Sequence, residues 1–387
     1  MKFPKRPSWQ FSVWMMRTEA GIYIHIPFCQ RKCHYCDFLS FSDASWVDAY
    51  WLKLEEEIAT SPHTGIAVPT VYFGGGTPSL AGKEQLSQLL HAVRSNYLLD
   101  MDAEITLEAN PGTLTKEKLE GWRSLGINRL SMGVQSFDDE MLKRIGRIHS
   151  GEDAIGALRQ ARDAGFSNIS MDLMYGLPHD SLERLREDLG VALSLGLEHI
   201  SVYGLILEPG TPFFRQMEAG QLELPEEEKN WAMRRLIDKV LGEGGLRRYE
   251  ISNYARPGLE SRHNLIYWRN LDYLGFGLGA SGKMQGIRRK NTSEPGEYLQ
   301  PGAVPFEEEV LTPDMIREEE IILALRLQEG LALDGYLHRY GKDFKDEYRE
   351  QIQLLIESGA MKVAEGRAVL TSRGMDIANE CMARFIS

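Results

Sequence analysis

Gly126-Ile-Asn-Arg-Leu-Ser131 opens with a glycine and an apolar residue and closes with an apolar residue followed by serine. The same pattern returns as Gly165-Phe-Ser-Asn-Ile-Ser170 and as Gly196-Leu-Glu-His-Ile-Ser201, after intervals of 39 and 31 residues. Those intervals are the size of one strand–helix unit. Each glycine can end an amphipathic helix in the left-handed conformation, and the apolar residues after it can begin a buried strand. The repeat therefore predicts strands that alternate with helices.

Helix signals before these glycines support that interpretation. Ser150-Gly-Glu-Asp153 has the form of a capping box, and apolar residues then follow at helical spacing as far as Gly165. A second amphipathic pattern runs from Ser181 to Gly196. Six short apolar runs are typical of buried parallel strands, and they cover residues 22–26, 70–73, 104–108, 129–134, 169–174 and 200–205. The pattern predicts an α/β fold, an open, partial (β/α)6 barrel with right-handed crossovers.

The C-terminal part of the chain follows a different pattern. Helical periodicity from Glu318 to Leu331 and from Tyr348 to Gly359 predicts a small, mostly helical C-terminal domain. We therefore divide the chain into an N-terminal extension (1–20), the partial barrel (21–215), a connecting segment (216–300) and a C-terminal domain (301–387). The extension has no continuous apolar region and no small-residue cleavage site, so we expect a disordered extension rather than a signal peptide.

Charge and cysteine usage exclude several classes of protein. The formal net charge of −12 disfavours a general binder of nucleic-acid phosphates, which needs a basic face. No apolar run reaches the roughly 18 residues that a membrane span needs. Three of the four cysteines lie within eight residues, whereas Cys381 stands alone in a helical pattern. Clustered thiols indicate a metal and a reducing, cytoplasmic compartment rather than a disulfide framework.

The unusual motifs all fall where a predicted strand ends. In parallel barrels, chemistry gathers at the carboxyl ends of the strands. The motifs are Pro27-Phe-Cys29, Gly74-Gly-Gly-Thr-Pro78, Glu108-Ala-Asn-Pro111, Gly133-Val-Gln-Ser136, Asp172 with Tyr175-Gly-Leu-Pro178, and Glu208-Pro-Gly210. This coincidence supports the strand assignment and predicts one site at that end of the barrel.

The cysteines Cys29, Cys33 and Cys36 follow the first strand with the spacing CxxxCxxC. Soft thiolates favour an iron–sulfur cluster, zinc or copper(I). A structural zinc site needs four ligands, and His25 or His34 could complete one. Three thiolates alone would bind three irons of a [4Fe-4S] cluster and leave the fourth iron open.

Taken in order, these motifs resemble those of the radical S-adenosylmethionine (SAM) superfamily. The closer resemblance is to the anaerobic coproporphyrinogen-III oxidase-like group, which contains the HemN oxidases and the HemW heme chaperones. It extends from about Gly21 to the end of the chain and implies a [4Fe-4S] cluster on the three clustered cysteines. In that superfamily the open iron chelates the methionine part of SAM, and electron transfer then gives a 5′-deoxyadenosyl radical.

The resemblance also implies the residues that contact SAM, although it identifies no catalytic residue. Carboxyl groups can accept hydrogen bonds from ribose hydroxyls, and an arginine can clamp a carboxylate through two hydrogen bonds. Without the resemblance, Arg147 would be typical of a solvated helix face and the three glycines of a turn. The implied SAM contacts are Tyr23, Tyr35, Gly75, Gly76, Thr77, Glu108, Gln135, Arg147 and Asp172.

Two features favour the chaperone branch over the oxidases. HemN-type oxidases carry a further cysteine where this chain has Phe38, and they have a longer N-terminal region. His263-Asn-Leu-Ile-Tyr-Trp268 matches the HNxxYW motif of the HemW branch, which implies that His263 is a heme ligand. By itself, a histidine beside aromatic residues is typical of a hydrogen-bonded core. The glycine-rich stretch 274–282 is expected to pack against the barrel.

The sequence therefore predicts a cytoplasmic heme chaperone that binds a [4Fe-4S] cluster, SAM and heme. Its expected partners are heme, a heme-acceptor protein that the sequence does not identify, and an electron donor if SAM is cleaved. The alternative is an enzyme that decarboxylates coproporphyrinogen or performs another radical reaction on a tetrapyrrole. A structural zinc protein is the third hypothesis.

Overall fold

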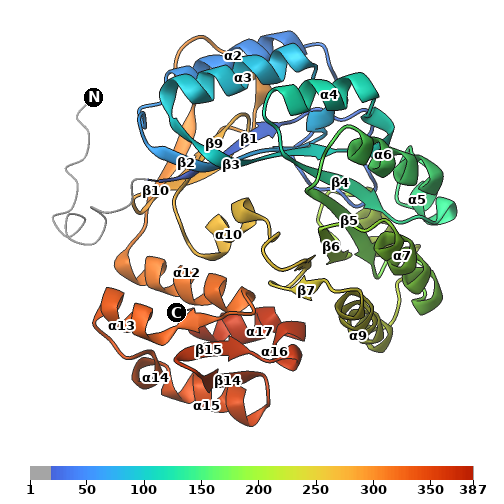
Figure 1. Ribbon diagram of the computed structural model, residues 1–387. Coiled ribbons are helices and arrows are strands. Elements are labelled where there is room, and N and C mark those ends of the chain that lie inside the picture. Colours follow the sequence, from blue (N-terminus) through green and yellow to red (C-terminus); the bar gives the residue numbers. More distant parts are fainter. Residues whose placement is uncertain (1–18, 387) are drawn as a thin grey trace.

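The computed structural model describes residues 19–386, so nearly all of the predicted N-terminal extension lies outside the described residues. All six predicted strands are confirmed, and they lie side by side in parallel at the centre of one curved sheet (Figure 1). They are β1 (Gly21–Ile26), β2 (Ala67–Gly75), β3 (Leu98–Ala109), β4 (Arg129–Gln135), β5 (Ile169–Tyr175) and β6 (His199–Gly204). Most apolar residues of these strands are almost completely buried, as parallel strands require, whereas Leu98 and Met101 at the start of β3 and Tyr203 near the end of β6 are exposed.

Helices between consecutive strands cover the outer, convex face of the sheet (Figure 1). They are α2 (Val47–Ala59), α3 (Lys83–Asn96), α4 (Lys116–Ser124), α5 (Asp139–Arg144), α6 (Gly151–Asp163) and α7 (Leu182–Ser194). The capping box of Ser150 and Asp153 is present at the start of α6. Gly126, Gly165 and Gly196 all have positive φ, between 64° and 94°. The local signals in the sequence therefore set the ends of these helices.

Later parts of the chain extend the same sheet at both edges, which the sequence analysis did not predict. On one side β9 (Tyr273–Phe276) pairs in parallel with β1, followed by the antiparallel strands β10 (Ser281–Met284), β11 (Ile287–Asn291) and β12 (Phe306–Val310). On the other side β8 (Asn253–Ala255) and β7 (Arg247–Arg248) follow β6. The glycine-rich stretch thus packs on the barrel as expected. At Gly275 a Cβ atom would lie only 2.0 Å from the carbonyl oxygen of Ser281.

A short helix, α10 (Arg262–Trp268), lies inside the curve of the sheet (Figure 1). Ser261 caps it, and the buried carboxylate of Glu104 accepts hydrogen bonds from the backbone N–H groups of Arg262 and His263 at 3.1 and 3.0 Å. A carboxylate at this position satisfies donors that the first helical turn leaves free. The HNxxYW motif is therefore fixed against β2 and β3, in the interior of the partial barrel.

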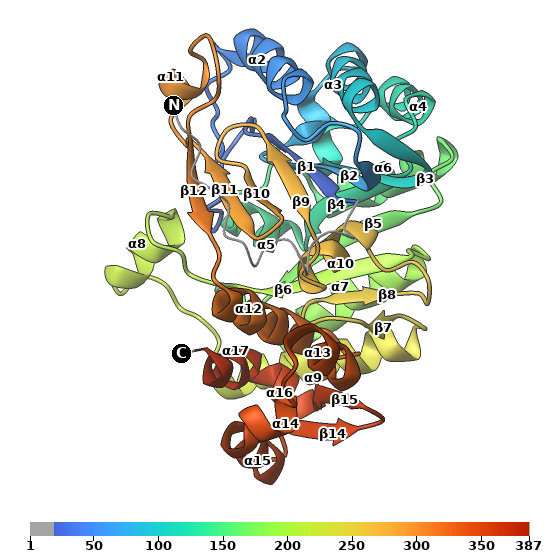
Figure 2. The ribbon, with the colours of Figure 1, turned by 90° about the vertical axis from the view of Figure 1, so that its left-hand side faces the viewer.

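The C-terminal region forms a separate layer with its own apolar core below the open side of the sheet (Figure 2). Its main helices are α12 (Pro313–Arg326) and α15 (Arg349–Glu357). Helix α15 confirms the predicted stretch 348–359, whereas α12 covers only part of the predicted stretch 318–331, because the helix ends at Arg326 and Leu331 begins a strand. It also contains a three-stranded antiparallel sheet, β13 (Leu331–Ala332), β15 (Arg367–Leu370) and β14 (Met361–Ala364). The short helices are α13 (Leu333–Tyr340), α14 (Phe344–Glu347), α16 (Ser372–Asp376) and α17 (Ala378–Met382).

The helices α8 (Pro212–Glu218) and α9 (Glu227–Glu243) lie between β6 and β7, and α11 (Pro295–Tyr298) lies between β11 and β12. Among residues 19–386, no helix has the length and apolar character that crossing a membrane requires.

Candidate cofactor-binding site

A cavity of about 440 Å³ lies at the carboxyl ends of the parallel strands. Its lining joins the cysteine loop after β1 to residues at the ends of β2 to β6. Most of the predicted site residues line it together: Cys29, Cys33, Tyr35, Cys36, Gly75, Gly76, Thr77, Glu108, Gln135, Arg147 and Asp172. Tyr23 and His263 are not part of the lining. The folded chain therefore gathers residues that are spread over more than 140 positions of sequence.

The thiols of Cys29 and Cys33 accept hydrogen bonds from polar groups of the barrel. Thr77 Oγ1 donates to Cys29 Sγ at 3.4 Å, and Arg147 Nη1 donates to Cys33 Sγ at 3.6 Å. The backbone N–H of Cys36 donates to the Cys33 carbonyl oxygen. Burial, with a smaller effect of the neighbouring cysteines, raises the pKa of the Cys36 thiol to about 11. A bound cation would reverse that effect, because metal coordination favours the thiolate.

The arrangement of the cysteines suits an iron–sulfur cluster better than a single zinc ion. Within residues 19–386, no three side chains of His, Cys, Asp or Glu are gathered as one metal ion would require. A cubane needs wider spacing, because each thiolate binds a different iron. The two histidines that could complete a zinc site bond elsewhere: His25 to Tyr23 and the Leu39 carbonyl oxygen, and His34 to the Arg144 carbonyl oxygen.

Gly75, the last residue of β2, and Gly76 after it are required by the packing of the protein itself. A Cβ atom on Gly75 would lie 2.6 Å from the His25 ring, and one on Gly76 would lie 2.7 Å from the Phe28 carbonyl oxygen. Gly75 also has a φ of +115°, which side chains other than hydrogen rarely tolerate. In the sequence analysis, the resemblance implied that Gly75 and Gly76 contact SAM. The structure adds a second cause, the close approach of β1.

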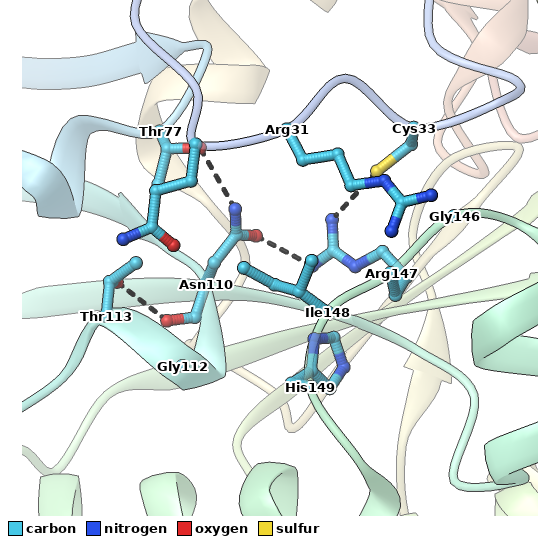
Figure 3. Close-up of a pocket in the computed structure, with 11 residues that line it drawn as sticks. Arg31, Cys33, Thr77, Asn110, Gly112, Thr113, Gly146, Arg147, Ile148 and His149 are labelled. Atoms are coloured by element: carbon cyan, nitrogen blue, oxygen red, sulfur yellow. Dashed lines mark hydrogen bonds between the residues drawn. The ribbon is translucent and has the colours of Figure 1, made fainter. Parts of the chain in front are cut away.

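Arg147 lines both this cavity and a second, smaller pocket, which Figure 3 shows. Its Nη2 donates to Asn110 Oδ1 at 2.7 Å and also to the carbonyl oxygen of Gly133, while the Asn110 amide donates to Thr77 Oγ1 at 3.0 Å. The Arg147 Nε atom is buried without a hydrogen-bond partner in the described residues. The guanidinium is thus held in place and has donor capacity left for a ligand, as the predicted carboxylate clamp requires.

Gln135 has a strained backbone next to this wall. Its φ is +73°, and the pairing of β4 with β5 shifts register between Gly133 and Gln135. Left-handed conformations of residues other than glycine cost about 1 to 3 kcal/mol and gather at functional sites. The bulge turns the Gln135 side chain into the cavity, where its amide can both donate and accept hydrogen bonds.

Two buried carboxyl groups face the cavity from β3 and β5. Glu108 accepts hydrogen bonds from Tyr72 Oη at 2.7 Å and from the Gly75 N–H at 3.0 Å. Asp172 hydrogen-bonds to Ser201. Burial raises the pKa of Glu108 to about 7 and that of Asp172 to about 6. Both groups can therefore accept hydrogen bonds when ionised and donate them when protonated.

The raised pKa of Glu108 predicts that stability falls with increasing pH. Between about pH 4.5 and pH 7 the folded chain binds the Glu108 proton more tightly than the unfolded chain does. The free energy of unfolding should drop by up to about 1.4 kcal/mol per pH unit in this window and level off above it. Urea unfolding across this range should show a smaller drop in Glu108→Gln, which cannot ionise. Equal slopes in both proteins would contradict the assignment.

His263 lies beneath the cavity, with both ring nitrogens hydrogen-bonded. Its side chain is 1% exposed. Nδ1 lies 2.7 Å from Thr70 Oγ1 and Nε2 lies 2.8 Å from Tyr267 Oη. The ring also stacks on Tyr72 at 5.0 Å between centroids. Burial lowers the His263 pKa to about 3, so the imidazole is neutral at ordinary pH. In this conformation His263 is a hydrogen-bonded core histidine, as is typical of a histidine beside aromatic residues.

Several residues of this site were not selected by the sequence analysis. Tyr72 bridges Glu108 and His263, Asn110 holds Arg147, and Asn264 and Arg129 line the cavity. Arg129 gave a usable signal, because an arginine in an otherwise apolar and small-residue strand faces either solvent or a lumen. The roles of the other three depend on contacts between distant segments, which no local pattern records.

Comparisons with known proteins agree with this arrangement. The Radical SAM superfamily model matches residues 23–192, and the HemN C-terminal domain model matches residues 311–377. The chain is 40% identical to the heme chaperone HemW of Bacillus subtilis over 373 residues, 94% of this chain and 98% of that protein. It is 34% identical to the heme chaperone HemW of Escherichia coli, over 95% of this chain and 98% of that protein.

A solved structure matches nearly the whole fold. Coproporphyrinogen III oxidase (HemN) from Escherichia coli, a radical SAM enzyme, superimposes with a TM-score of 0.84 at 25% identity. The match covers 98% of this chain and 92% of that protein. The partial barrel and the C-terminal layer are thus arranged as in that enzyme.

Proposed function

Because the chain belongs to the HemW heme chaperone family within the radical SAM superfamily, we propose that it binds heme and delivers it to an acceptor protein. The observation that carries this proposal is similarity to HemW proteins along almost the entire chain, which includes the HNxxYW motif. Phe38 agrees with it, since this position holds a cysteine in HemN-type oxidases. Phe38 is 60% exposed at the cavity lining and offers no metal ligand there.

We further propose that the cavity holds the [4Fe-4S] cluster and SAM. Cys29, Cys33 and Cys36 would ligate the cluster, while Arg147 is placed to bind the SAM carboxylate. When bound, the two cofactors supply one-electron chemistry through the adenosyl group. Thr77 and Arg147, which already donate to cysteine sulfur atoms, would stabilise the thiolates. Glu108, Gln135 and Asp172 offer hydrogen-bonding groups of the kind that ribose and ammonium groups need.

Tyr35, Gly75, Gly76 and Thr77 line the cavity and complete the proposed SAM site, whereas Tyr23 supports it from outside the lining. Tyr35 lies beside Arg147 and the cysteines, and burial raises its pKa, so its hydroxyl stays protonated. Tyr23 stacks on Tyr72 at 6.2 Å between ring centroids and acts from behind the cavity wall. Its role would be to position Tyr72, and through it Glu108, rather than to touch SAM.

His263 could bind heme iron only after a local rearrangement. Thr70 can accept from the Nδ1 proton, which leaves the Nε2 lone pair to accept from the Tyr267 hydroxyl. The same lone pair would bind iron, since a neutral imidazole coordinates metals through its unprotonated nitrogen. Heme ligation therefore requires that Tyr267 move away while Thr70 keeps the ring oriented. Tyr267 and Trp268 would then be free to contact the macrocycle.

The competing hypothesis is coproporphyrinogen oxidation, which the likeness to HemN and the intact cavity favour. We expect the cluster-loaded protein, supplied with SAM and reductant, to bind heme but to leave coproporphyrinogen III unchanged. Anaerobic incubation followed by chromatography of the porphyrins tests the second part, and a heme absorbance titration tests the first. Protoporphyrinogen formation above the no-enzyme control would replace the chaperone proposal with the oxidase.

The acceptor protein and an electron donor for the cluster are proposed as partners. We place the protein in the cytoplasm because three closely spaced free thiols need a reducing compartment. Transfer of heme to a purified apo-hemoprotein, followed by the absorbance of the product, would test the delivery step.

A further inference from the structure

Arg129 is a fully buried arginine inside the partial barrel. It begins β4 and is only 2% exposed, yet it contributes to the lining of the cavity. Arg129 and Arg147 lie at different ends of β4. Arg129 is the first residue of the strand, whereas the Arg147 side chain contacts Gly133, four residues further along it. Four residues of a strand span about 13 Å, so the two arginines mark different depths of the lumen.

The surroundings of Arg129 leave its charge without a direct partner. Its Nε atom has no hydrogen-bond partner among the described residues. The closest carboxyl groups bond elsewhere, Glu108 to Tyr72 and Gly75, and Asp172 to Ser201, and they act on Arg129 only through space. Burying a guanidinium without a partner is costly, so native proteins seldom do it without a function.

Besides the carboxyl groups of Glu108 and Asp172, neutral polar groups line the cavity together with Arg129. Ser131 and Ser170 face the lumen from β4 and β5, and Asn264 reaches it from α10. His199 hydrogen-bonds through Nδ1 to Ser170 and through Nε2 to Tyr249, and burial holds its pKa well below the usual value. Hydroxyl and amide donors around a buried cation are the composition of an anion site.

We propose that the deep end of the cavity, formed by Arg129, Ser131, Ser170 and Asn264, binds the carboxylate group of a second ligand. The proposal goes beyond the SAM and heme assignments above and rests on them only for the placement of SAM. SAM carries a single carboxylate, which Arg147 would hold at the other end of the lumen. The remainder of the second ligand would extend toward Met174 and Tyr203 at the wall of the cavity.

Such a carboxylate has two possible sources. It can be a propionate side chain of heme, or it can belong to a separate small organic acid. Both present the same group to a guanidinium, which binds carboxylates through two parallel hydrogen bonds. The HNxxYW motif would then contribute to two sites. Asn264 would belong to the carboxylate site, while His263, which faces Tyr267, would belong to the heme-iron site.

The first experiment asks whether Arg129 is a ligand-binding residue or a structural one. Arg129→Met keeps the length of the side chain and removes a buried, unpaired charge. The ligand-free, cluster-loaded variant should unfold at a temperature about 2 °C higher than the wild type. Arg123→Met on α4, which removes an arginine that stacks on Phe166 outside the lumen, should give no such rise. A clear loss of stability in Arg129→Met would overturn the proposal.

The second experiment identifies the source of the carboxylate. If it belongs to heme, the wild type should bind heme at least about tenfold more tightly than heme dimethyl ester, and Arg129→Met should bind both equally. If it belongs to a separate acid, millimolar propionate but not propionamide should raise the unfolding temperature of the wild type alone. Arg129→Lys should restore part of either preference, because it keeps the charge.

These results separate this site from the proposed function. A wild type that responds to propionate but binds no heme would end the chaperone proposal and leave the carboxylate site intact. The carboxylate site would be overturned, whatever the heme affinity, by either of two results. One is a wild type that distinguishes neither heme from its dimethyl ester nor propionate from propionamide. The other is an Arg129→Met protein that still distinguishes one of these pairs.

Discussion

Cys33→Ala is expected to abolish the iron–sulfur cluster. The cluster needs three thiolates, one for each of three irons, and the variant has only two. The nearby His25 and His34 are hydrogen-bonded to other groups and do not replace the lost thiolate. The variant should lose essentially all iron and sulfide after anaerobic reconstitution, together with the broad visible absorbance. The Cys29→Ala and Cys36→Ala variants should behave in the same way.

Cys381→Ala is the matched control for this loss. Cys381 is fully buried in the core of the C-terminal layer, on α17, and its thiol lies 3.8 Å from the Gly374 carbonyl oxygen. Removing the sulfur there leaves a small cavity and should cost about 1 kcal/mol of stability, with iron content near that of the wild type. Comparable iron in Cys33→Ala and the wild type would show that the cluster, if present, has other ligands.

His263→Ala should give the second large effect, a loss of both heme binding and stability. The substitution removes a ring stacked on Tyr72 and leaves the hydroxyls of Thr70 and Tyr267 without their partner. Together these losses should lower the free energy of unfolding by about 2 to 4 kcal/mol. If His263 also ligates iron, heme affinity should fall at least tenfold and the heme absorption bands should shift, while iron–sulfur content stays near wild type.

Tyr267→Phe distinguishes a ligand from a packed core residue. It keeps the aromatic contact with His263 but removes the hydroxyl that occupies the Nε2 lone pair. In the wild type, heme binding must break the hydrogen bond between Tyr267 and His263, which costs about 1 kcal/mol. Because Tyr267→Phe lacks this bond, it should bind heme about fivefold more tightly. Unchanged heme affinity in Tyr267→Phe, combined with unchanged spectra in His263→Ala, would limit His263 to a structural role. The iron ligand would then have to be sought elsewhere.

The site was only partly predictable from the sequence. The cysteine motif is compact, so its three thiols necessarily lie on one loop, and the strand-end motifs necessarily meet at one edge of a parallel sheet. In contrast, the position of Tyr23 behind the cavity wall and the double hydrogen bonding of His263 arise from packing. Thr70 and His263 are 193 residues apart, and their contact exists only because α10 folds back inside the sheet.

The sequence by itself determined the six parallel strands, the ends of the helices between them and the cluster motif. These features depend on neighbours a few residues apart: apolar runs, the serine caps of α6 and α7, and the glycines with positive φ after α4, α6 and α7. Only the tertiary structure decided that β9 pairs with β1 and that Arg129 is buried without a direct partner. It also decided the raised pKa of Glu108, because desolvation and charge act across the folded chain, between residues that the sequence keeps far apart.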